Sequence, residues 1–363
     1  MIEDRTSGPV RRAEASPIPS AEQTKMKASA STQCTVDFEK DGKQIGFFHL
    51  PLSAHDDAWG VIRIPLAVIK NGNGPTVILE GGNHGDEYEG PIALGEIIRD
   101  LDPGRVSGRL IFVPAINLPA VMAATRTSPI DGLNMNRTFP GDANGTSTQQ
   151  ISAFVNDMLF PMGHAFLDLH SGGSSLDLIP SAVIEPVADA AKHAENVAAV
   201  TAFDAPMIVV IDNRGDPRTA TASAARAGLT VVGTEMAGGG TVSLDALDIC
   251  RRGTRNVLAH LGVLPAEDGS PLRHEPKLYE IPGQDGFVLA TEDGVFEPFH
   301  ANGTPVSAGQ PAGRIHFLND PGKRPVELRY GHDGILYGRR QPGRVKPGNC
   351  CLVVASPYRR SLS

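Results

Sequence analysis

The chain has 363 residues, of which 40 % are hydrophobic and 20 % are charged. This length suits two domains, and this composition excludes a disordered or fibrous chain because it supplies enough apolar side chains for a sizeable core. Lys and Arg total 33 against 41 for Asp and Glu, which gives a net charge of −8. An acidic chain argues against nucleic acid or an anionic membrane surface as the main partner. A site for an anion would therefore depend on a few placed arginines.

The cysteines and the first residues bear on the cellular compartment. Cys34 and Cys250 are isolated and Cys350 and Cys351 are adjacent, so there is no Cys-x-x-Cys pair for a zinc ribbon or a redox motif. Residues 1–25 lack the apolar segment of a secretory signal, and no stretch is long and apolar enough to span a bilayer. We therefore expect a cytoplasmic protein with reduced thiols and no membrane partner.

Along the chain, a mobile tail rich in Ser, Ala and Pro is predicted for residues 1–34, and an α/β domain for residues 35–268. Short apolar runs predict strands at 44–50, 60–69, 76–80, 109–114, 165–169, 207–211 and 230–234. Helical spacing of apolar residues predicts helices at 90–101, 149–159, 187–201, 219–227 and 243–261. Strands that alternate with helices need crossover connections, so we expect a mostly parallel mixed sheet flanked by helices.

Helical spacing ends after this α/β region. Short β-type runs at 286–289, 313–317, 334–337 and 351–354 then alternate with Gly and Pro turns. We therefore predict a small all-β domain over residues 269–363. This domain would act either as a lid over a substrate pocket or as a folding or oligomerisation module.

Three common enzyme motifs are absent. The sequence contains no Gly-x-Ser-x-Gly elbow, no phosphate loop that ends in Gly-Lys-Ser/Thr, and no Gly-x-Gly-x-x-Gly after a strand. Their absence argues against a serine esterase, a nucleotide hydrolase and a dinucleotide-dependent enzyme.

Histidines and carboxylates follow two of the predicted strands. The loop GGNHGDEYEG after strand 76–80 contains His84 and Glu87, and a later strand leads into His170 in the run LDLHSGG. Ligands of open α/β sheets bind at the carboxyl ends of strands, and two histidines with one glutamate are a common set of catalytic zinc ligands. On these residues alone, a polar loop without a metal is an equally good interpretation. Asp168 would orient a ligand from behind or simply occupy a strand face.

Two further segments add a candidate base and candidate anion-binding residues. A predicted strand leads into Glu235, and a run of glycines follows. Burial of a carboxylate at the end of such a strand costs free energy, so it is expected only where the carboxylate has a charged partner or a chemical role. Beside a metal it would suit a general base, although alone a surface glutamate next to a flexible turn is the simpler interpretation. Arg126, Asn136 and Arg137 lie in RTSPIDGLNMNRTFPG, and a guanidinium suits a carboxylate, but ordinary surface arginines explain them equally well.

The segments GGNHGDEYEG, DGLNMNRTFPG, LDLHSGG and GTEMAGGG occur in this order. Together they resemble the succinylglutamate desuccinylase/aspartoacylase family, a branch of the zinc-carboxypeptidase-like fold, over about residues 60–355. The longer runs NHGDEYEGPIAL and TRTSPIDGLNMNRTFPGD look most like the branch of this family that deacetylates N-acetyl-L-2,4-diaminobutyrate in ectoine degradation.

The resemblance implies a zinc-dependent amide hydrolase that holds one Zn²⁺ ion per chain. His84, Glu87 and His170 match the zinc ligands of the family, and Glu235 matches its general base. The substrate would be a small N-acyl amino acid, and the expected products are acetate and L-2,4-diaminobutyrate.

The resemblance also implies substrate-binding residues. Asn136 and Arg137 match the pair that holds the substrate carboxylate, and Arg126 matches the arginine that polarises the scissile carbonyl. The stretch between the two arginines is longer than in aspartoacylases. The candidates without a motif are Arg218 and Arg226 for a second carboxylate, Tyr330 for the tyrosine that the family supplies from its C-terminal domain, and Asp177, Asp212 or Asp216 for a side-chain amine.

Other interpretations stay open at this point. An aspartoacylase-like or succinylglutamate desuccinylase-like enzyme would bind an acidic acyl substrate through a second arginine, and a carboxypeptidase would accept longer peptides. A non-catalytic protein would bind an acylated amino acid without any use for Glu235. The sequence also leaves a homodimer open.

Overall fold

The computed structural model describes residues 33–211 and 215–359. Residues 1–32 of the predicted mobile tail, and Asp212 among the candidate acidic residues, lie outside the described residues. Gln33–Cys34, which the prediction assigned to the tail, form the short strand β1 and pair with the next strand.

Strands and α-helices occur together as far as His260, and the described residues after it form strands and short 3-10 helices. The strands up to residue 280 are β1, β2 (Gly42–Leu52), β3 (Gly60–Asn71), β4 (Thr76–Gly81), β5 (Gly108–Val113), β6 (Ala165–His170), β7 (Leu176–Leu178), β8 (Ser181–Ile184), β9 (Met207–Val210), β10 (Thr230–Glu235) and β11 (Leu278–Glu280). The helices are α1 (Glu89–Asp100), α2 (Leu118–Ala123), α3 (Ser147–Phe154), α4 (Ala190–Phe203), α5 (Ala220–Arg226) and α6 (Leu244–His260). The later strands are β12 (Phe287–Leu289), β13 (Gly294–Pro298), β14 (Pro305–Val306), β15 (Pro311–His316), β16 (Val326–Arg329), β17 (Gly334–Arg340), β18 (Arg344–Val345) and β19 (Cys350–Pro357).

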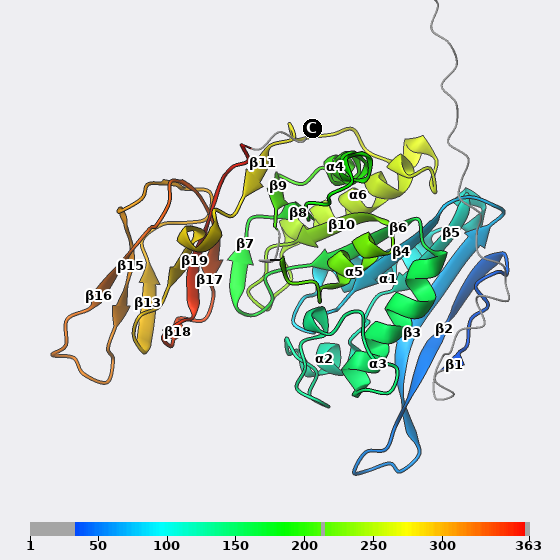
Figure 1. Ribbon diagram of the computed structural model, residues 1–363, viewed down its shortest axis with the longest axis horizontal. Coiled ribbons are helices and arrows are strands. Elements are labelled where there is room, and N and C mark those ends of the chain that lie inside the picture. Colours follow the sequence, from blue (N-terminus) through cyan, green and yellow to red (C-terminus); the bar gives the residue numbers. More distant parts are fainter. Residues whose placement is uncertain (1–32, 212–214, 360–363) are drawn as a thin grey trace, which may run out of the picture.

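A mixed sheet of 15 strands runs through the described part of the chain (Figure 1). Its order is β1-β2-β3-β5-β4-β6-β10-β8-β9-β11-β19-β17-β14, with β12 beside β19 and β7 beside β17. The four central strands β5, β4, β6 and β10 are mutually parallel, whereas β1, β2 and β3 on one side and β8 on the other join antiparallel. Every residue of β4 and β6 is buried, as expected for parallel strands covered on both faces.

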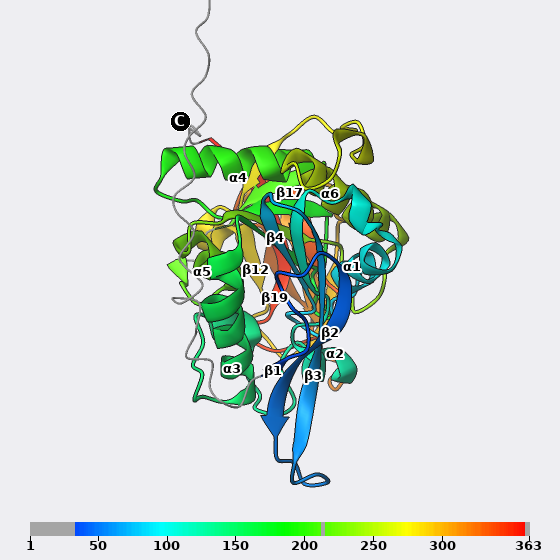
Figure 2. The ribbon, with the colours of Figure 1, turned by 90° about the vertical axis from the view of Figure 1, so that its right-hand side faces the viewer.

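Helices cover both faces of the central strands (Figure 2). On one face, apolar residues of α1, α4 and α6 pack with the sheet in a core that includes Leu94, Val200 and Leu247. On the other face, α3 and α5 contribute Phe154 and Ala224 to a second core. These two layers fix the central strands, and the strand ends between them carry the polar residues of the candidate site.

The C-terminal strands form an antiparallel β region that is joined to the main sheet. β19 pairs with β11, β12 and β17, and a separate sheet of the described residues has the order β16-β15-β13-β18. β7, which follows the loop after β6, pairs with β17. The prediction of a β-rich C-terminal region over an α/β unit is confirmed at the level of fold, while the boundary at residue 268 stays a prediction because hydrogen-bonded strands continue past it.

All the elements predicted from the sequence are present, with shifted ends. The helix predicted at 187–201 begins later, at Ala190, because Asp189 caps it by accepting a hydrogen bond from the backbone N–H of Lys192. The helix predicted at 149–159 is α3 followed by one π-helical turn, Val155–Leu159. The sequence analysis missed β8, a short strand between two prolines.

None of the helices in residues 33–211 and 215–359 is long and apolar enough to cross a membrane.

Gly85 provides a test of the packing that holds the loop after β4. A Cβ atom at this position would lie 1.9 Å from the backbone carbonyl carbon of Ala120, so Gly85→Ala must displace one of the two segments. We expect a loss of about 1–3 kcal/mol in the free energy of unfolding, measured by urea denaturation. Gly95→Ala in α1 is the control, because a Cβ there meets only the flexible end of Arg99, and we expect it to raise stability by up to about 1 kcal/mol. Equal stability of both variants and the parent would contradict this account of the loop.

Candidate metal centre and active site

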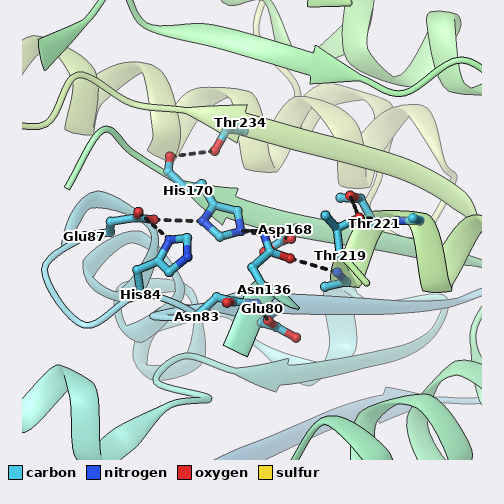
Figure 3. A network of polar contacts seen from close by, with 12 residues as sticks. Glu80, Asn83, His84, Glu87, Asn136, Asp168, His170, Thr219, Thr221 and Thr234 are labelled. Atoms are coloured by element: carbon cyan, nitrogen blue, oxygen red, sulfur yellow. Dashed lines mark hydrogen bonds and ion pairs between the residues drawn. The ribbon is translucent and has the colours of Figure 1, made fainter. Parts of the chain in front are cut away.

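Three strands of the parallel core place candidate residues at one edge of the sheet (Figure 3). β4 ends at Gly81, and the loop that follows carries His84 and Glu87. β6 ends at His170, and β10 ends at Glu235. Glu235 lies opposite His170 in the register of β6 and β10, so the carboxyl ends of the three strands meet as expected.

His84, Glu87 and His170 form a buried cluster. The Nδ1 atom of His84 lies 2.7 Å from Oε1 of Glu87, and the Nδ1 atom of His170 lies 2.8 Å from Oε2 of the same carboxylate. One potential ligand atom from each residue lies within 4.8 Å of the others. Two imidazoles that converge on one carboxylate are a donor set suited to a divalent ion such as zinc.

The outer nitrogen of each histidine faces the oxygen of another side chain. The Nε2 atom of His84 lies 3.1 Å from Oδ1 of Asn134, and the Nε2 atom of His170 lies 3.0 Å from Oδ2 of Asp168. Metal-binding histidines generally have such a partner, which fixes the ring orientation and leaves the other nitrogen for the metal. The arrangement therefore fits a metal at the Nδ1 side of both rings.

The charges of this cluster influence one another strongly. Burial opposes ionisation of Glu87, but His84 and His170 outweigh it and hold the pKa of Glu87 well below its usual range. Burial also opposes protonation of His170, but Asp168 and Glu87 raise the pKa of this histidine well above its usual value. For His84, burial prevails and lowers the pKa. The negative groups around His170 thus favour a positive charge in the centre of the cluster, which is the charge that a metal ion supplies.

A second buried carboxylate lies behind the cluster. Glu80 is the neighbour of Asp168 in the register of β4 and β6, and its Oε1 accepts a hydrogen bond of 2.9 Å from Asn83. Burial, with Asp168 as the next cause, raises the pKa of Glu80 to about 8. Burial therefore favours the neutral form of Glu80 behind the cluster.

Glu235 is placed to exchange a proton beside the cluster. Its Oε2 atom is shielded from solvent and has no hydrogen-bond partner among the described residues. Burial, followed by the charge of Glu87, raises the pKa of Glu235 to about 8. On β8, Ser181 lies opposite Glu235 and hydrogen-bonds over 2.6 Å with the hydroxyl of Tyr337 from the C-terminal region. A carboxyl group with a raised pKa in a cavity is suited to acid–base catalysis.

A cavity of about 340 Å³ opens beside the cluster. It is lined by the seven residues that match motifs of the family in the sequence analysis: His84, Glu87, Arg126, Asn136, Arg137, His170 and Glu235. The structure therefore brings together residues that are up to 151 positions apart in the chain (235 − 84).

Arg126 reaches the cluster from the side. One of its terminal nitrogens lies 3.6 Å from Oε1 of Glu87 and 3.3 Å from Nδ1 of His84. Its side chain is 45 % exposed, so it can turn towards a molecule in the cavity. This position beside the candidate metal ligands suits a group that stabilises developing negative charge.

Asn136 lies between the cluster and α5, with its Nδ2 atom 3.4 Å from Nε2 of His170, and Arg137 follows it in the chain. The Oδ1 atom of Asn136 accepts a hydrogen bond of 2.9 Å from the backbone of Ala220. Arg137 donates to the backbone oxygen of Asn136 over 2.6 Å and lies 3.3 Å from Asp216. These contacts fix the asparagine amide and part of the guanidinium in the cavity wall.

The candidates without a motif lie elsewhere. Arg218 forms two hydrogen bonds with Asp216, of 2.9 and 2.8 Å, and Arg226 donates to the backbone of Pro217 and lines a separate cavity of about 580 Å³. Tyr330 is buried in the C-terminal core, where its hydroxyl contacts His300, so the interpretation of Tyr330 as a pocket residue is wrong. Among the described lining residues, the arginines are Arg126 and Arg137.

Sequence reasoning missed three residues around the cavity. Asn134 stands in the motif LNMNR and could have been included, because the oxygen of an asparagine amide can accept a hydrogen bond from a histidine ring. Glu185 lines the cavity but directly follows the unpredicted strand β8. Tyr337 approaches from the C-terminal region, and no local pattern distinguishes it from Tyr330.

A helix-covered parallel sheet with a His–Glu–His cluster and a carboxyl group beside it is the arrangement of a metal-dependent hydrolase. The family model of the succinylglutamate desuccinylase/aspartoacylase catalytic domain matches residues 73–261. N-alpha-acetyl-L-2,4-diaminobutyric acid deacetylase of Halomonas elongata is 41 % identical over 322 residues, which cover 88 % of this chain and 94 % of that protein.

Solved structures agree with this match. The product-bound structure of the ectoine utilization protein EutE (DoeB) from Ruegeria pomeroyi has a TM-score of 0.86 and 41 % identity over 90 % of this chain and 99 % of that chain. A succinylglutamate desuccinylase/aspartoacylase from Rhodobacter sphaeroides has a TM-score of 0.84 and 40 % identity over 91 % of this chain and all of that chain. The chain belongs to the succinylglutamate desuccinylase/aspartoacylase family, whose members are deacylases of N-acyl amino acids. The resemblance and fold class expected from the sequence are confirmed.

Asp168 provides a test of the metal centre. We expect Asp168→Asn to weaken binding of one Zn²⁺ per chain by about 10- to 100-fold, because the carboxylate that orients His170 and balances its charge is lost. A competition titration against a chromophoric chelator measures this affinity. The control is Asp177→Asn, which removes a carboxylate that contacts Asn302 instead of the cluster. Unchanged zinc affinity in Asp168→Asn would contradict the proposed orientation of His170.

Proposed function

We propose that this protein is a zinc-dependent deacetylase that hydrolyses N-alpha-acetyl-L-2,4-diaminobutyrate to acetate and L-2,4-diaminobutyrate in ectoine degradation. The observation that carries the proposal is one cavity lined by the His–Glu–His cluster, Glu235, Arg126 and the Asn136–Arg137 pair. The relatives from Halomonas elongata and Ruegeria pomeroyi support the choice of substrate and pathway. The cytoplasmic location expected from the sequence stays a prediction.

His84, Glu87 and His170 would hold the zinc ion through the two Nδ1 atoms and the Glu87 carboxylate. When bound, zinc acts as a Lewis acid and makes water a stronger nucleophile at neutral pH. Asn134 and Asp168 keep both rings in the required orientation. The side chains of Glu87 and the two histidines would move apart when the ion binds between them.

Glu235 acts as the base and then as the acid. In its ionised form it accepts a proton from the water that attacks the acetyl carbonyl, and it passes this proton to the departing α-amine when the C–N bond breaks. Burial and the charge of Glu87 raise the pKa of Glu235 to about 8 although His170 and Arg126 act in the opposite direction, and further positive charge in the cluster would lower it towards the working pH.

The arginines bind the two other polar groups of the substrate. Arg126 stabilises the oxyanion that forms from the amide carbonyl, an effect worth about 3–4 kcal/mol for a well-placed donor. Asn136 and Arg137 hold the α-carboxylate, which fixes the amide bond beside Glu235. One end of the substrate is thereby anchored while its carbonyl lies at the cluster.

The rival functions fit the cavity less well. An aspartoacylase-like or desuccinylase-like substrate carries an additional carboxylate, whereas Arg126 and Arg137, the arginines among the described lining residues, already have roles. A non-catalytic binder would not need a buried acid–base group such as Glu235 beside the cluster.

A panel of N-acyl amino acids tests the substrate. We expect kcat/KM for N-alpha-acetyl-L-2,4-diaminobutyrate to exceed the values for N-acetyl-L-aspartate and N-succinyl-L-glutamate by at least about tenfold, because the latter two place a second anion in the cavity. Release of free amine measures the rate with the zinc-loaded protein. A preference for acetyl-aspartate would disprove this substrate and leave the chemistry intact.

Replacement of the base tests the mechanism. We expect Glu235→Gln to lower kcat by about 10²- to 10⁴-fold while zinc content stays at one ion per chain, because the glutamine cannot accept the proton. Single-turnover kinetics and elemental analysis provide the two measurements. Glu267→Gln, at an exposed carboxylate that pairs with Arg105, is the control and should keep full activity. Normal turnover by Glu235→Gln would remove Glu235 from its role.

A further inference from the structure

We propose that Glu185 is the residue that recognises the side-chain ammonium group of the substrate, an inference that rests on the proposed deacetylase function. 2,4-Diaminobutyrate differs from most amino acids by a cationic amine two methylene groups beyond the α-carbon. A cavity that selects it needs an anionic group beside the carboxylate-binding pair. The candidates named from the sequence for this role were Asp177, Asp212 and Asp216.

Glu185 lines the same cavity as the His–Glu–His cluster, but it lies further along the sheet than the cluster does. Ser181 of β8 lies opposite Glu235, and Val183 lies opposite Gly233. Side chains alternate between faces, so Glu185 continues along the face of Val183, away from Glu235. Val183, Gly233 and Glu185 all line the cavity. A molecule held at the cluster can therefore extend its side chain towards Glu185.

Two hydroxyls at the start of α5 orient the Glu185 carboxylate. Thr221 donates a hydrogen bond of 2.7 Å to its Oε1 atom, and the hydroxyl of Thr219 lies 3.3 Å from the same atom. Figure 3 shows Thr219 and Thr221 on the far side of Asn136 from Glu87. These two hydrogen bonds hold the carboxylate in a defined position at the cavity wall.

The position of Glu185 matches the charges of the substrate. Burial lowers the pKa of Arg137, and Asp216 and Glu185 act in the opposite direction, which places the Glu185 carboxylate near this guanidinium. In the amino acid, the α-carboxylate and the side-chain ammonium are likewise neighbours of opposite sign. The α-carboxylate at Arg137 and the ammonium at Glu185 would thus form two adjacent pairs, each between opposite charges.

The other acidic candidates are less suitable. Both oxygens of Asp216 accept hydrogen bonds from Arg218, and Asp216 does not appear among the described residues that line the cavity of the cluster. Asp177 accepts a hydrogen bond from Asn302 and lies 3.7 Å from Arg339, and it does not appear among the described residues that line the cavity.

A pair of matched substrates separates recognition of the ammonium from catalysis. N-alpha-acetyl-L-2,4-diaminobutyrate and N-alpha-acetyl-L-norvaline have the same length, but norvaline carries a methyl group where the former has the ammonium. We expect Glu185→Gln to lower the ratio of their kcat/KM values by about 10- to 100-fold, because a hydrogen bond to a charged group contributes roughly 1.5–3 kcal/mol. Asp216→Asn is the matched control and should leave this ratio unchanged, since both substrates carry the same carboxylate.

Thr221→Val is a milder variant that keeps the volume of the side chain and removes the orienting hydroxyl. It should lower the same ratio by several-fold, and it keeps the proposal testable where Glu185→Gln fails to fold. A ratio that stays constant in Glu185→Gln or in Thr221→Val, or that falls in Asp216→Asn instead, would overturn the role of Glu185.

Binding of the free amino acids distinguishes this inference from the proposed function. Calorimetry with L-2,4-diaminobutyrate and L-norvaline measures the same preference without turnover. If the parent protein hydrolyses neither acetylated substrate, the deacetylase function fails, while a preference for diaminobutyrate that disappears in Glu185→Gln still supports the recognition. If hydrolysis is normal and Glu185→Gln keeps the preference, the recognition by Glu185 alone is wrong.

Discussion

The parallel pairing of β6 with β10 is the constraint on which the site depends. Its register sets His170 opposite Glu235, and the pairing of β6 with β4 sets Asp168 opposite Glu80. A shift by one residue would turn each of these side chains to the other face of the sheet. The buried apolar residues of the three strands fix the register, so the core of the protein also determines the distance between the candidate metal ligands and the candidate base.

The burial of so many carboxyl groups at one edge of the sheet explains the character of the site. Glu80 and Glu235 both have pKa values of about 8, because charge is costly in this environment, whereas Glu87 stays ionised between His84 and His170. Buried charges are stable only when they are paired or hold a metal. A divalent ion on the Nδ1 side of the histidines would balance the charge of Glu87 and would favour ionisation of Glu235. Binding of the ion would thus also prepare Glu235 to accept a proton.

The sequence allowed prediction of the parts that depend on local pattern. The loop of His84 and Glu87 and the strand that ends at His170 were recognisable because apolar runs lead directly into polar residues and glycines. Glu185 was not, because β8 has four residues between two prolines and because its partner hydroxyls come from α5, more than 30 positions later. The choice of Tyr330 was wrong for a similar reason, since only the pairing of β17 with β7 and β19 brings Tyr337 next to Ser181. Contacts made by tertiary structure alone leave no local pattern to detect.

Anomalous X-ray diffraction at the zinc absorption edge, from crystals of the zinc-loaded protein, tests the central claim most directly. The account predicts a single strong peak per chain, about 2.0–2.1 Å from Nδ1 of His84 and of His170 and bonded to the Glu87 carboxylate. A peak at any other group of side chains, or a fully loaded and active protein without a peak at these three residues, would contradict it.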